Sequence, residues 1–525
     1  MRIVESFRDN NGKPKNRTLF SLGKVEDYSP KQLENIAKKL LEAAGMVMED
    51  IVPEQFTEIN RLNYGYALVI KTLWSLFDMD KLTRLLSKSK KVRFDWINVL
   101  QLMIAERISN PTSKRQNYFH QQDYLGFNPQ TSLQHYYRTL DILADGQQII
   151  KQHFFQARQN LFTQQLDVVF YDVTTLYFDS YKQDKDGLRQ KGYSKDGKAH
   201  KTQVVLGLLV DQLRNPVTYN IYRGNTYEGK TIVDALEQLK KQYRIKHVVV
   251  VADSAMIDKF NREYMEANGV DYILGDRIKN LPENIKEILL NRDIHKPVSS
   301  YIPKDKLSYT EVEYQGRRIV CTWSEKRARK DAQEREKLLE KAREWIKNPS
   351  KYKQTKKRGA GRYVKEDNNG NMLLLNEEVI KRDARYDGFK AIATTTDMPA
   401  ADLLEKYGDL YQVEHAFRTL KSQLEIRPMF HWTDKRIEGH IAMCFMAYTF
   451  LNYLRNATGL KEREIIKALD KMQMSEIKEK KDDEIVYMRS YITEEQKVLA
   501  QKLKIKLPYD VMSQKAVNQI FNQKM

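Results

Sequence analysis

The segment LDVVFYDVTTLYF (Leu166–Phe178) is an apolar run, rich in β-branched and aromatic residues, with Asp172 in its middle. Such a composition predicts a buried β-strand. A carboxylate inside a buried strand is costly unless it is hydrogen-bonded or bound to a cation. Asp172 is therefore the first candidate site residue.

The residues that follow extend this strand into a sheet. TQVVLGLLV (202–210) and PVTYNIYRG (216–224) predict two more strands, and TIVDALEQLKKQY (231–243) predicts an amphipathic helix. HVVVVAD (247–253) is a short strand that ends in Asp253, and VDYILGD (270–276) is a fifth strand after another helix. Three meandering strands followed by alternating helices and strands predict a mixed five-stranded sheet with flanking helices.

The remaining chain divides around this core. The expected parts are an N-terminal β-hairpin (1–28), a helical region (29–162), the first part of the core (163–278), a largely β insertion with one charged helix (279–398), the second part of the core (399–450) and a helical C-terminal region (451–525). The fold class is therefore mixed α/β with an interrupted core.

The charge balance points to a polyanionic partner. Lys and Arg number 89 against 70 Asp and Glu, a net charge of +19, which favours nucleic acid first and a membrane surface second. A basic but merely solvated surface is the alternative. DNA-backbone contacts are expected at Lys114 and Arg115 and in the acid-free basic run at Lys356, Lys357 and Arg358, although such a run is more often a solvated loop.

The cysteine content and the N-terminal sequence indicate the cellular compartment of the protein. Only two cysteines occur, far apart, and the N-terminus has no apolar signal core. The run IAMCFMAYTFLNYL (441–454) is too short to cross a bilayer and predicts a buried helix. We expect a cytoplasmic, soluble protein.

A third acidic candidate lies in YQVEHAFRTLK (411–421). If one helix begins near Ala400, Tyr407, Glu414 and Lys421 share a face because they are seven residues apart, and Arg418 lies beside them. A plain i,i+4 ion pair of Glu414 with Arg418 is the alternative.

Asp172, Asp253 and Glu414 together would form an oxygen-only site. If neighbouring strands bring the two aspartates together, their repulsion calls for a cation or a proton. Hard oxygen ligands suit Mg²⁺ or Mn²⁺, and two such ions about 4 Å apart support in-line displacement at phosphorus. Lys421 and Arg418 would then grip phosphate, and Tyr407 would brace a phosphate or stack on a base.

GNTYEGKT (Gly224–Thr231) supports a different class of protein, because it matches the phosphate-loop pattern of nucleotide hydrolases with Lys230 as the phosphate-binding lysine. The strand before it alternates apolar and polar residues, as an antiparallel strand does, whereas a phosphate loop follows a buried parallel strand. Glu228 inside the loop would also repel an anion.

These motifs resemble those of the DDE transposases of bacterial insertion sequences, in the subgroup with a Y-R-E-K helix. Tyr407, Glu414 and Lys421 fall at the family spacing, whereas Leu410 replaces the arginine. YDVTTLYF, VVVVAD, GNTYEGKT and RPMFHW (427–432) are similar to other family segments.

The resemblance covers about residues 166–450. It implies a ribonuclease-H-like core, metal-dependent cut-and-paste transposition with Asp172, Asp253 and Glu414 as catalytic residues, double-stranded DNA ends as substrate and a synaptic homodimer. Another metal-dependent nuclease of the same core, or a DNA-binding protein that has lost catalysis, stays open as an alternative.

Overall fold

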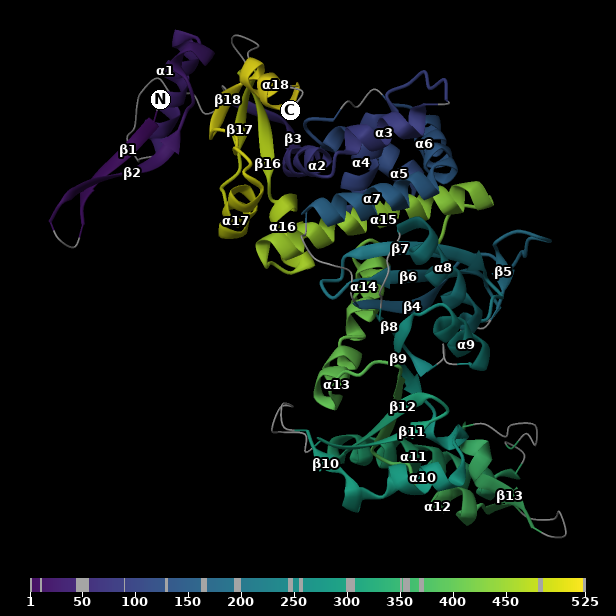
Figure 1. The fold of residues 1–525 in the computed structure, drawn as a ribbon. Coiled ribbons are helices and arrows are strands. Elements are labelled where there is room, and N and C mark those ends of the chain that lie inside the picture. The colour runs from purple at the N-terminus through teal and green to yellow at the C-terminus, as the bar shows by residue number, and fades with distance from the viewer. Residues whose placement is uncertain are drawn as a thin grey trace. The chain divides into compact units, whose positions relative to one another are not determined.

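The fold is described from a computed structural model of the 525-residue chain. The structure describes residues 2–9, 12–43, 56–88, 90–127, 131–161, 168–192, 200–243, 249–254, 258–298, 307–349, 352, 359–367, 373–479 and 485–522. The chain forms two compact units (Figure 1). One contains residues 166–172 and 227–413, and the other contains residues 1–165, 173–226 and 414–525.

The first unit, residues 166–172 and 227–413, is built on parallel strands. The start of β4 (Val168–Tyr177) pairs in parallel with β8 (Val249–Ala252), and β8 pairs in parallel with β9 (Asp271–Asp276). The helices between these strands are α8 (Thr231–Tyr243) and α9 (Lys259–Ala267). Strand β8 is short and apolar, as expected for a strand that is covered on both faces.

The insertion extends this sheet. β15 (Phe389–Thr394) pairs antiparallel with β9, and β12 (Arg317–Ser324), β11 (Leu307–Tyr314) and β10 (Lys296–Pro297) follow in order. The other elements here are α10 (Glu283–Leu290), α11 (Glu325–Lys347), β13 (Val364–Glu366), β14 (Leu373–Leu375), α12 (Glu377–Ala384) and α13 (Ala400–Gly408). The inserted strands therefore share one sheet with β9.

In the second unit, the rest of β4 neighbours β6 (Thr202–Val210), which pairs antiparallel with β7 (Pro216–Arg223) and β5 (Gln190–Lys191). Strand β4 has β8 on one edge and β6 on the other, β9 follows β8, and β7 pairs with β6. This strand order is that of a ribonuclease-H-like core. The predicted fold class is thus confirmed.

Helix α15 (Asp434–Thr458) is the centre of the second unit. It is buried along almost its whole length and contacts α4 (Trp96–Ser109), α6 (Leu133–Asp145), α7 (Gln147–Leu161) and β7 (Figure 1). A Cβ at Gly439 would collide with the Leu140 carbonyl, so glycine is what lets α15 and α6 approach so closely. Across the described residues, no helix is both long and apolar enough to span a membrane.

This unit also contains β1 (Arg2–Arg8), β2 (Pro14–Ser21), α1 (Pro30–Ala43), α2 (Gly65–Leu76), α3 (Met79–Ser87), α5 (Lys114–His120), α14 (Tyr411–Ser422), α16 (Glu462–Asp470), α17 (Glu494–Leu503) and α18 (Gln514–Asn522). Strands β1 and β2 form an antiparallel hairpin. Helix α14 begins in the first unit and continues in the second from Glu414.

The terminal regions also contain a sheet that the sequence analysis did not predict. β3 (Phe56–Asn63) pairs with β16 (Gln473–Glu479), which is followed by β17 (Ile485–Arg489) and β18 (Val511–Ser513). β3 and β16 carry many charged residues, and their pairing joins positions more than 400 residues apart. The regions expected to be helical are therefore mixed.

Candidate active site

The two aspartates of the predicted site lie at the same level of the sheet. Tyr171 of β4 is the register partner of Ala252 of β8, so Asp172 and Asp253 occupy the next step along two parallel, adjacent strands. Asp172 is half-buried within β4, and Asp253 is exposed directly after β8. Neighbouring parallel strands are about 4.8 Å apart, so the structure places these two residues at adjacent positions of one unit.

Asp172 and Asp253 form a row across β4 and β8, called the acidic row here, and Gly275 continues it on the third strand, β9. Ala252 is the partner of Leu274 on β9, which places Gly275 level with Asp253. A Cβ at position 275 would collide with the Tyr407 hydroxyl and would lie 3.1 Å from the Ser254 backbone nitrogen. The absence of a side chain at Gly275 thus makes room for Tyr407, from α13, beside the residue that follows Asp253.

Lys390 was not predicted from the sequence, although it contacts this tyrosine. Its Nζ lies 4.3 Å from the centroid of the Tyr407 ring, a cation–π distance. Lys390 is on β15, in the insertion, and no local sequence pattern links it to Tyr407. The insertion therefore supplies a cation to the surroundings of the acidic row.

Asp276, which follows Gly275 on β9, has a different role from Asp172 and Asp253. Successive strand residues face opposite sides of a sheet, so Asp276 does not share the face of Gly275. Its carboxylate lies 3.4 Å from Arg317 Nη2, and both side chains are buried. Asp276 is thus engaged in an internal ion pair.

Glu414 lies on the outer face of α14. Val413, Ala416, Phe417 and Leu420 of this helix are buried, whereas Glu414 and Arg418 are exposed. Leu420 packs with Leu206 of β6, so the helix lies on the sheet of its unit. Among the described residues neither Glu414 nor Arg418 forms a salt bridge, so the simple i,i+4 pair is not what the structure contains.

The single helix expected from Ala400 onward is wrong. α13 ends at Gly408 and α14 begins at Tyr411, with Asp409 and Leu410 in a turn between them. Tyr407 and Glu414 are therefore on different helices, and the alignment argued from a continuous helical repeat does not hold. Gly408 explains the break, because glycine is a poor helix former.

The donor set suits a hard divalent cation. Asp172 and Asp253 offer oxygen ligands at adjacent positions, which fits Mg²⁺ or Mn²⁺. Within the part of the chain that the structure describes, no group of three or more His, Cys, Asp or Glu side chains is gathered as a metal site. The geometry thus supplies a pair of carboxylates, and Glu414 belongs to the other unit.

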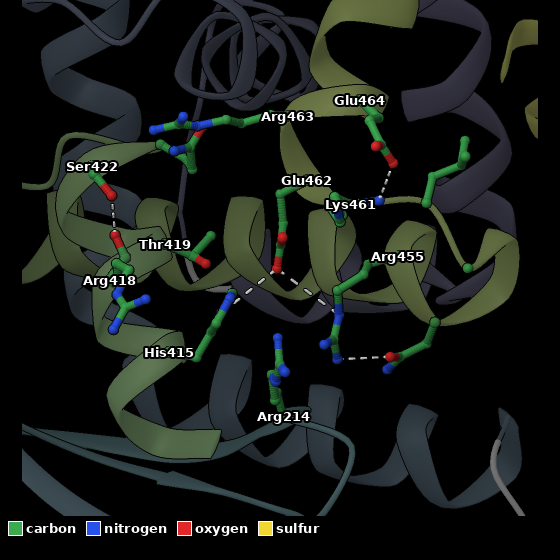
Figure 2. A pocket seen from close by; sticks show the side chains of 14 residues that line it. Arg214, His415, Arg418, Thr419, Ser422, Arg455, Lys461, Glu462, Arg463 and Glu464 are labelled. Carbon is green, nitrogen blue, oxygen red and sulfur yellow. Dashed lines mark hydrogen bonds and ion pairs between the residues drawn. The ribbon is translucent and has the colours of Figure 1, made fainter. Parts of the chain in front are cut away.

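Arg418 and Lys421 lie in different surroundings on α14. Arg418 lines a pocket of about 930 Å³ in its own unit (Figure 2). Lys421 is half-buried, with its Nζ 5.8 Å from the Phe417 ring centroid. Arg214, Arg455 and Arg463 line the same pocket as Arg418 and were not predicted. Because each is isolated in the sequence, no motif could have found them.

The phosphate contact expected of Lys114 is not supported. Lys114 is only 2% exposed, and burial lowers the pKa of its ammonium group to about 7. A side chain that is enclosed in this way does not reach DNA. Arg115 is exposed. Lys356, Lys357 and Arg358 lie outside the described residues.

The phosphate-loop alternative is not supported either. The strand that precedes GNTYEGKT is β7, which pairs antiparallel with β6, whereas a phosphate loop follows a parallel strand. A Cβ at Gly224 would collide with the carbonyl oxygens of Gln203 and Gln190. The glycine therefore serves close packing of neighbouring strands.

Comparisons with known proteins agree with this geometry. Residues 163–450, more than half of the chain, match the family model of the transposase DDE domain, and residues 1–47 match the N-terminal domain of the IS1634 family transposases. No curated protein matches the chain.

Solved structures give weaker likenesses. A piggyBac transposase synaptic complex with hairpin DNA is 8% identical over 88% of this chain and 86% of that one, with a TM-score of 0.39. A Mos1 transposase paired-end complex with the left transposon end is 14% identical over 35% of this chain and 59% of that one, with a TM-score of 0.16. The family assignment therefore depends on the family models.

Those models cover both acidic strands, the insertion and the glutamate-bearing helix, together with the N-terminal hairpin. The fold class is that expected for such an enzyme. The chain belongs to the DDE transposase family of insertion sequences and is a DNA transposase, an enzyme that cleaves DNA and transfers its strands.

Proposed function

We propose that Asp172, Asp253 and Glu414 are the catalytic residues and that they hold two Mg²⁺ or Mn²⁺ ions. The observation that carries this is the placement of Asp172 and Asp253 at one level of two adjacent parallel strands. Bound divalent ions would activate the attacking hydroxyl and stabilise the departing oxygen. Dependence on divalent metal is general in the DDE family to which the chain belongs.

The protein's own groups would position the DNA. Arg418 is exposed one helical turn after Glu414 and forms no salt bridge with the described residues. Guanidinium groups bind phosphate through two parallel hydrogen bonds. Tyr407 lies beside the acidic row and would brace a phosphate or stack on a base. Lys421, Arg115 and the basic run Lys356–Arg358 would add backbone contacts, which give affinity without sequence preference.

The substrate we propose is double-stranded DNA carrying the terminal inverted repeats of an insertion sequence. The net charge of +19 supports a polyanionic partner. We further propose a cut-and-paste reaction in a synaptic homodimer, in which two copies of the chain hold the two ends of one element. Lys114, which is buried, has no part in these contacts.

The test uses the full chain with a labelled duplex that ends in the inverted repeat of its own element, with Mg²⁺, Mn²⁺ or EDTA. The wild type should cleave with either metal and not in EDTA. Asp172→Asn, Asp253→Asn and Glu414→Gln should each lower the cleavage rate at least about 10³-fold, because each removes one charge that holds the metals.

Binding of the same duplex in EDTA is the control, and it should change less than about threefold in the three variants. Equal cleavage by wild type and variants would contradict the assignment of the site. Tight binding by the wild type without cleavage in either metal would show instead a DNA-binding protein that has lost catalysis.

A further inference from the structure

The pocket that Arg418 lines is a feature of one compact unit. It has a volume of about 930 Å³ and is bounded by α14, the end of α15, the start of α16 and the β6–β7 turn. Figure 2 shows Arg214 at the bottom of the view, His415 and Arg418 at the left, Arg455 at the right and Arg463 at the upper left. Four separate elements thus bring cationic side chains to one cavity.

Positive charge exceeds negative charge in this pocket. Its lining contains five cationic side chains against two acids: Arg214, Arg418, Arg455, Lys461 and Arg463, with Glu462 and Glu464. Glu462 is shared, because its Oε1 lies 3.8 Å from His415 Nδ1 and 3.9 Å from Arg455 Nε. Glu464 accepts a hydrogen bond from the Lys461 backbone nitrogen. The lining residues therefore carry three more positive charges than negative charges.

Several nitrogen atoms of the pocket have at most long ion-pair contacts with the described residues. Arg455 Nε and His415 Nδ1 are buried and make no hydrogen bond to the described residues. Arg418 and Arg463 are exposed and form no salt bridge within the described ranges. Buried donors are normally satisfied, so these atoms indicate a ligand or water.

Arg214 is held in the pocket at a conformational cost. Its φ is +62°, the left-handed region, where residues other than glycine, asparagine and aspartate are uncommon. The turn is fixed by Asp211, which accepts hydrogen bonds from the Leu213 and Asn215 backbone nitrogens, and Arg455 Nη2 donates to the Leu213 carbonyl. Backbone strain of this kind is typical of functional positions.

The pocket lies next to the glutamate of the proposed active site. Arg418 follows Glu414 by four residues, a rise of about 6 Å along α14. A DNA strand cleaved at Glu414 would therefore place a neighbouring phosphate at Arg418. Guanidinium groups are suited to phosphate, and a phosphodiester chain supplies the negative charge that the pocket lacks.

We propose that this pocket binds the backbone phosphates of the DNA strand next to the cleaved bond, with Arg214, Arg418 and Arg463 as the contacting residues. This rests on the proposed function, because it takes DNA as the substrate. It adds Arg214 and Arg463, from the β6–β7 turn and α16, to the residues that hold the strand.

The test measures how DNA binding depends on salt. The full chain is titrated with the inverted-repeat duplex in EDTA at several NaCl concentrations, and the slope of log Kd against log salt is determined. Arg214→Gly and Arg463→Ala should each lower the slope by about 0.9, the value for one lost phosphate contact. Glycine at 214 suits the left-handed backbone, so the turn is kept.

Lys467→Ala is the matched control, since Lys467 is an exposed cation of α16 that does not line the pocket. Its slope should equal that of the wild type. Unchanged slopes in both pocket variants, or an equal fall in the control, would overturn the pocket as a phosphate site while leaving the transposase function intact. A wild type that does not bind the duplex at all would overturn the proposed function itself.

A second measurement locates the phosphate. A series of duplexes carries one neutral methylphosphonate at successive positions along the strand. The wild type should lose affinity at a phosphate within about two nucleotides of the cleaved bond, and Arg214→Gly should lose no more there, because the contact is already absent. If each methylphosphonate lowers the affinity of Arg214→Gly as much as it lowers that of the wild type, at every position, the assignment is overturned.

Discussion

Asp172 illustrates how one residue links strand and chemistry. It interrupts an apolar strand, and its neighbours Tyr171 and Val173 are buried. A nearby cation would stabilise the ionised carboxylate of Asp172. The adjacent Asp253 increases this stabilisation, because the two negative charges repel each other without a cation. The sequence predicted both aspartates, since each stands out against the apolar residues around it.

Lys114 shows where prediction from single residues fails. The sequence places it in a basic, polar stretch, but its side chain is enclosed next to Glu106 and Cys444. Burial raises the pKa of Glu106 to about 8 as it lowers that of Lys114. Whether a lysine lies inside or outside depends on what packs over it, here α15, which is more than 300 residues away.

Two buried histidines lie in the same region, and they give a prediction about acid stability. The His431 and His440 ring centroids are 4.9 Å apart, and burial, with Lys114 and Arg107 nearby, lowers the pKa of His431 to about 3 and that of His440 well below its usual range. The unfolded chain therefore binds more protons than the folded chain below pH 6.5, so stability is lost as pH falls.

Each histidine should cost about 1 to 1.5 kcal/mol of stability at pH 5.5. Thermal melts at pH 7.5 and 5.5 should show a smaller drop in Tm between the two values for the His431→Gln/His440→Gln double variant than for the wild type. An equal drop in both proteins would show that these histidines are not the groups responsible.

At the scale of elements, the contact of α13 with β9 depends on Gly275. Gly275→Ala would place a methyl group against the Tyr407 hydroxyl, and overpacking of this kind costs about 1 to 3 kcal/mol. Tyr407→Phe removes the hydroxyl, so the double variant should recover most of the loss. Thermal melts of the four proteins measure this coupling.

Gly408→Ala is the matched control, because a Cβ at position 408 meets nothing within 4 Å. Its Tm should equal or exceed that of the wild type. Two results would contradict the claim that the Tyr407 hydroxyl packs against Gly275 of β9. One is a Gly275→Ala protein as stable as Gly408→Ala, and the other is a failure of Tyr407→Phe to restore the Tm of Gly275→Ala.

Elements differ in how far the sequence predicts them. β8 is a continuous run of valines whose composition requires a covered strand, and it was predicted with its terminal aspartate. β3 and β16 each contain charged residues of both signs and pair with each other across the sequence, which no local pattern encodes. The break between α13 and α14 was missed because the seven-residue spacing suggested one continuous helix.

At the scale of the whole molecule, the fold class and the family are established, and the sequence predicted both. The acidic pair was predictable because strand order follows from the alternation of strands and helices. The cationic pocket was not, because only Arg418 belongs to a motif, and Arg214, Arg455 and Arg463 come from three other elements. Convergence of Glu414 on the acidic pair is the central proposal.

The most direct test of that proposal is an anomalous difference map from crystals of the full chain grown with MnCl₂ and inverted-repeat DNA. We predict two Mn²⁺ peaks that Asp172, Asp253 and Glu414 hold together. Peaks that lack Glu414 as a ligand, or no peak at Asp172 and Asp253 with DNA bound, would contradict it.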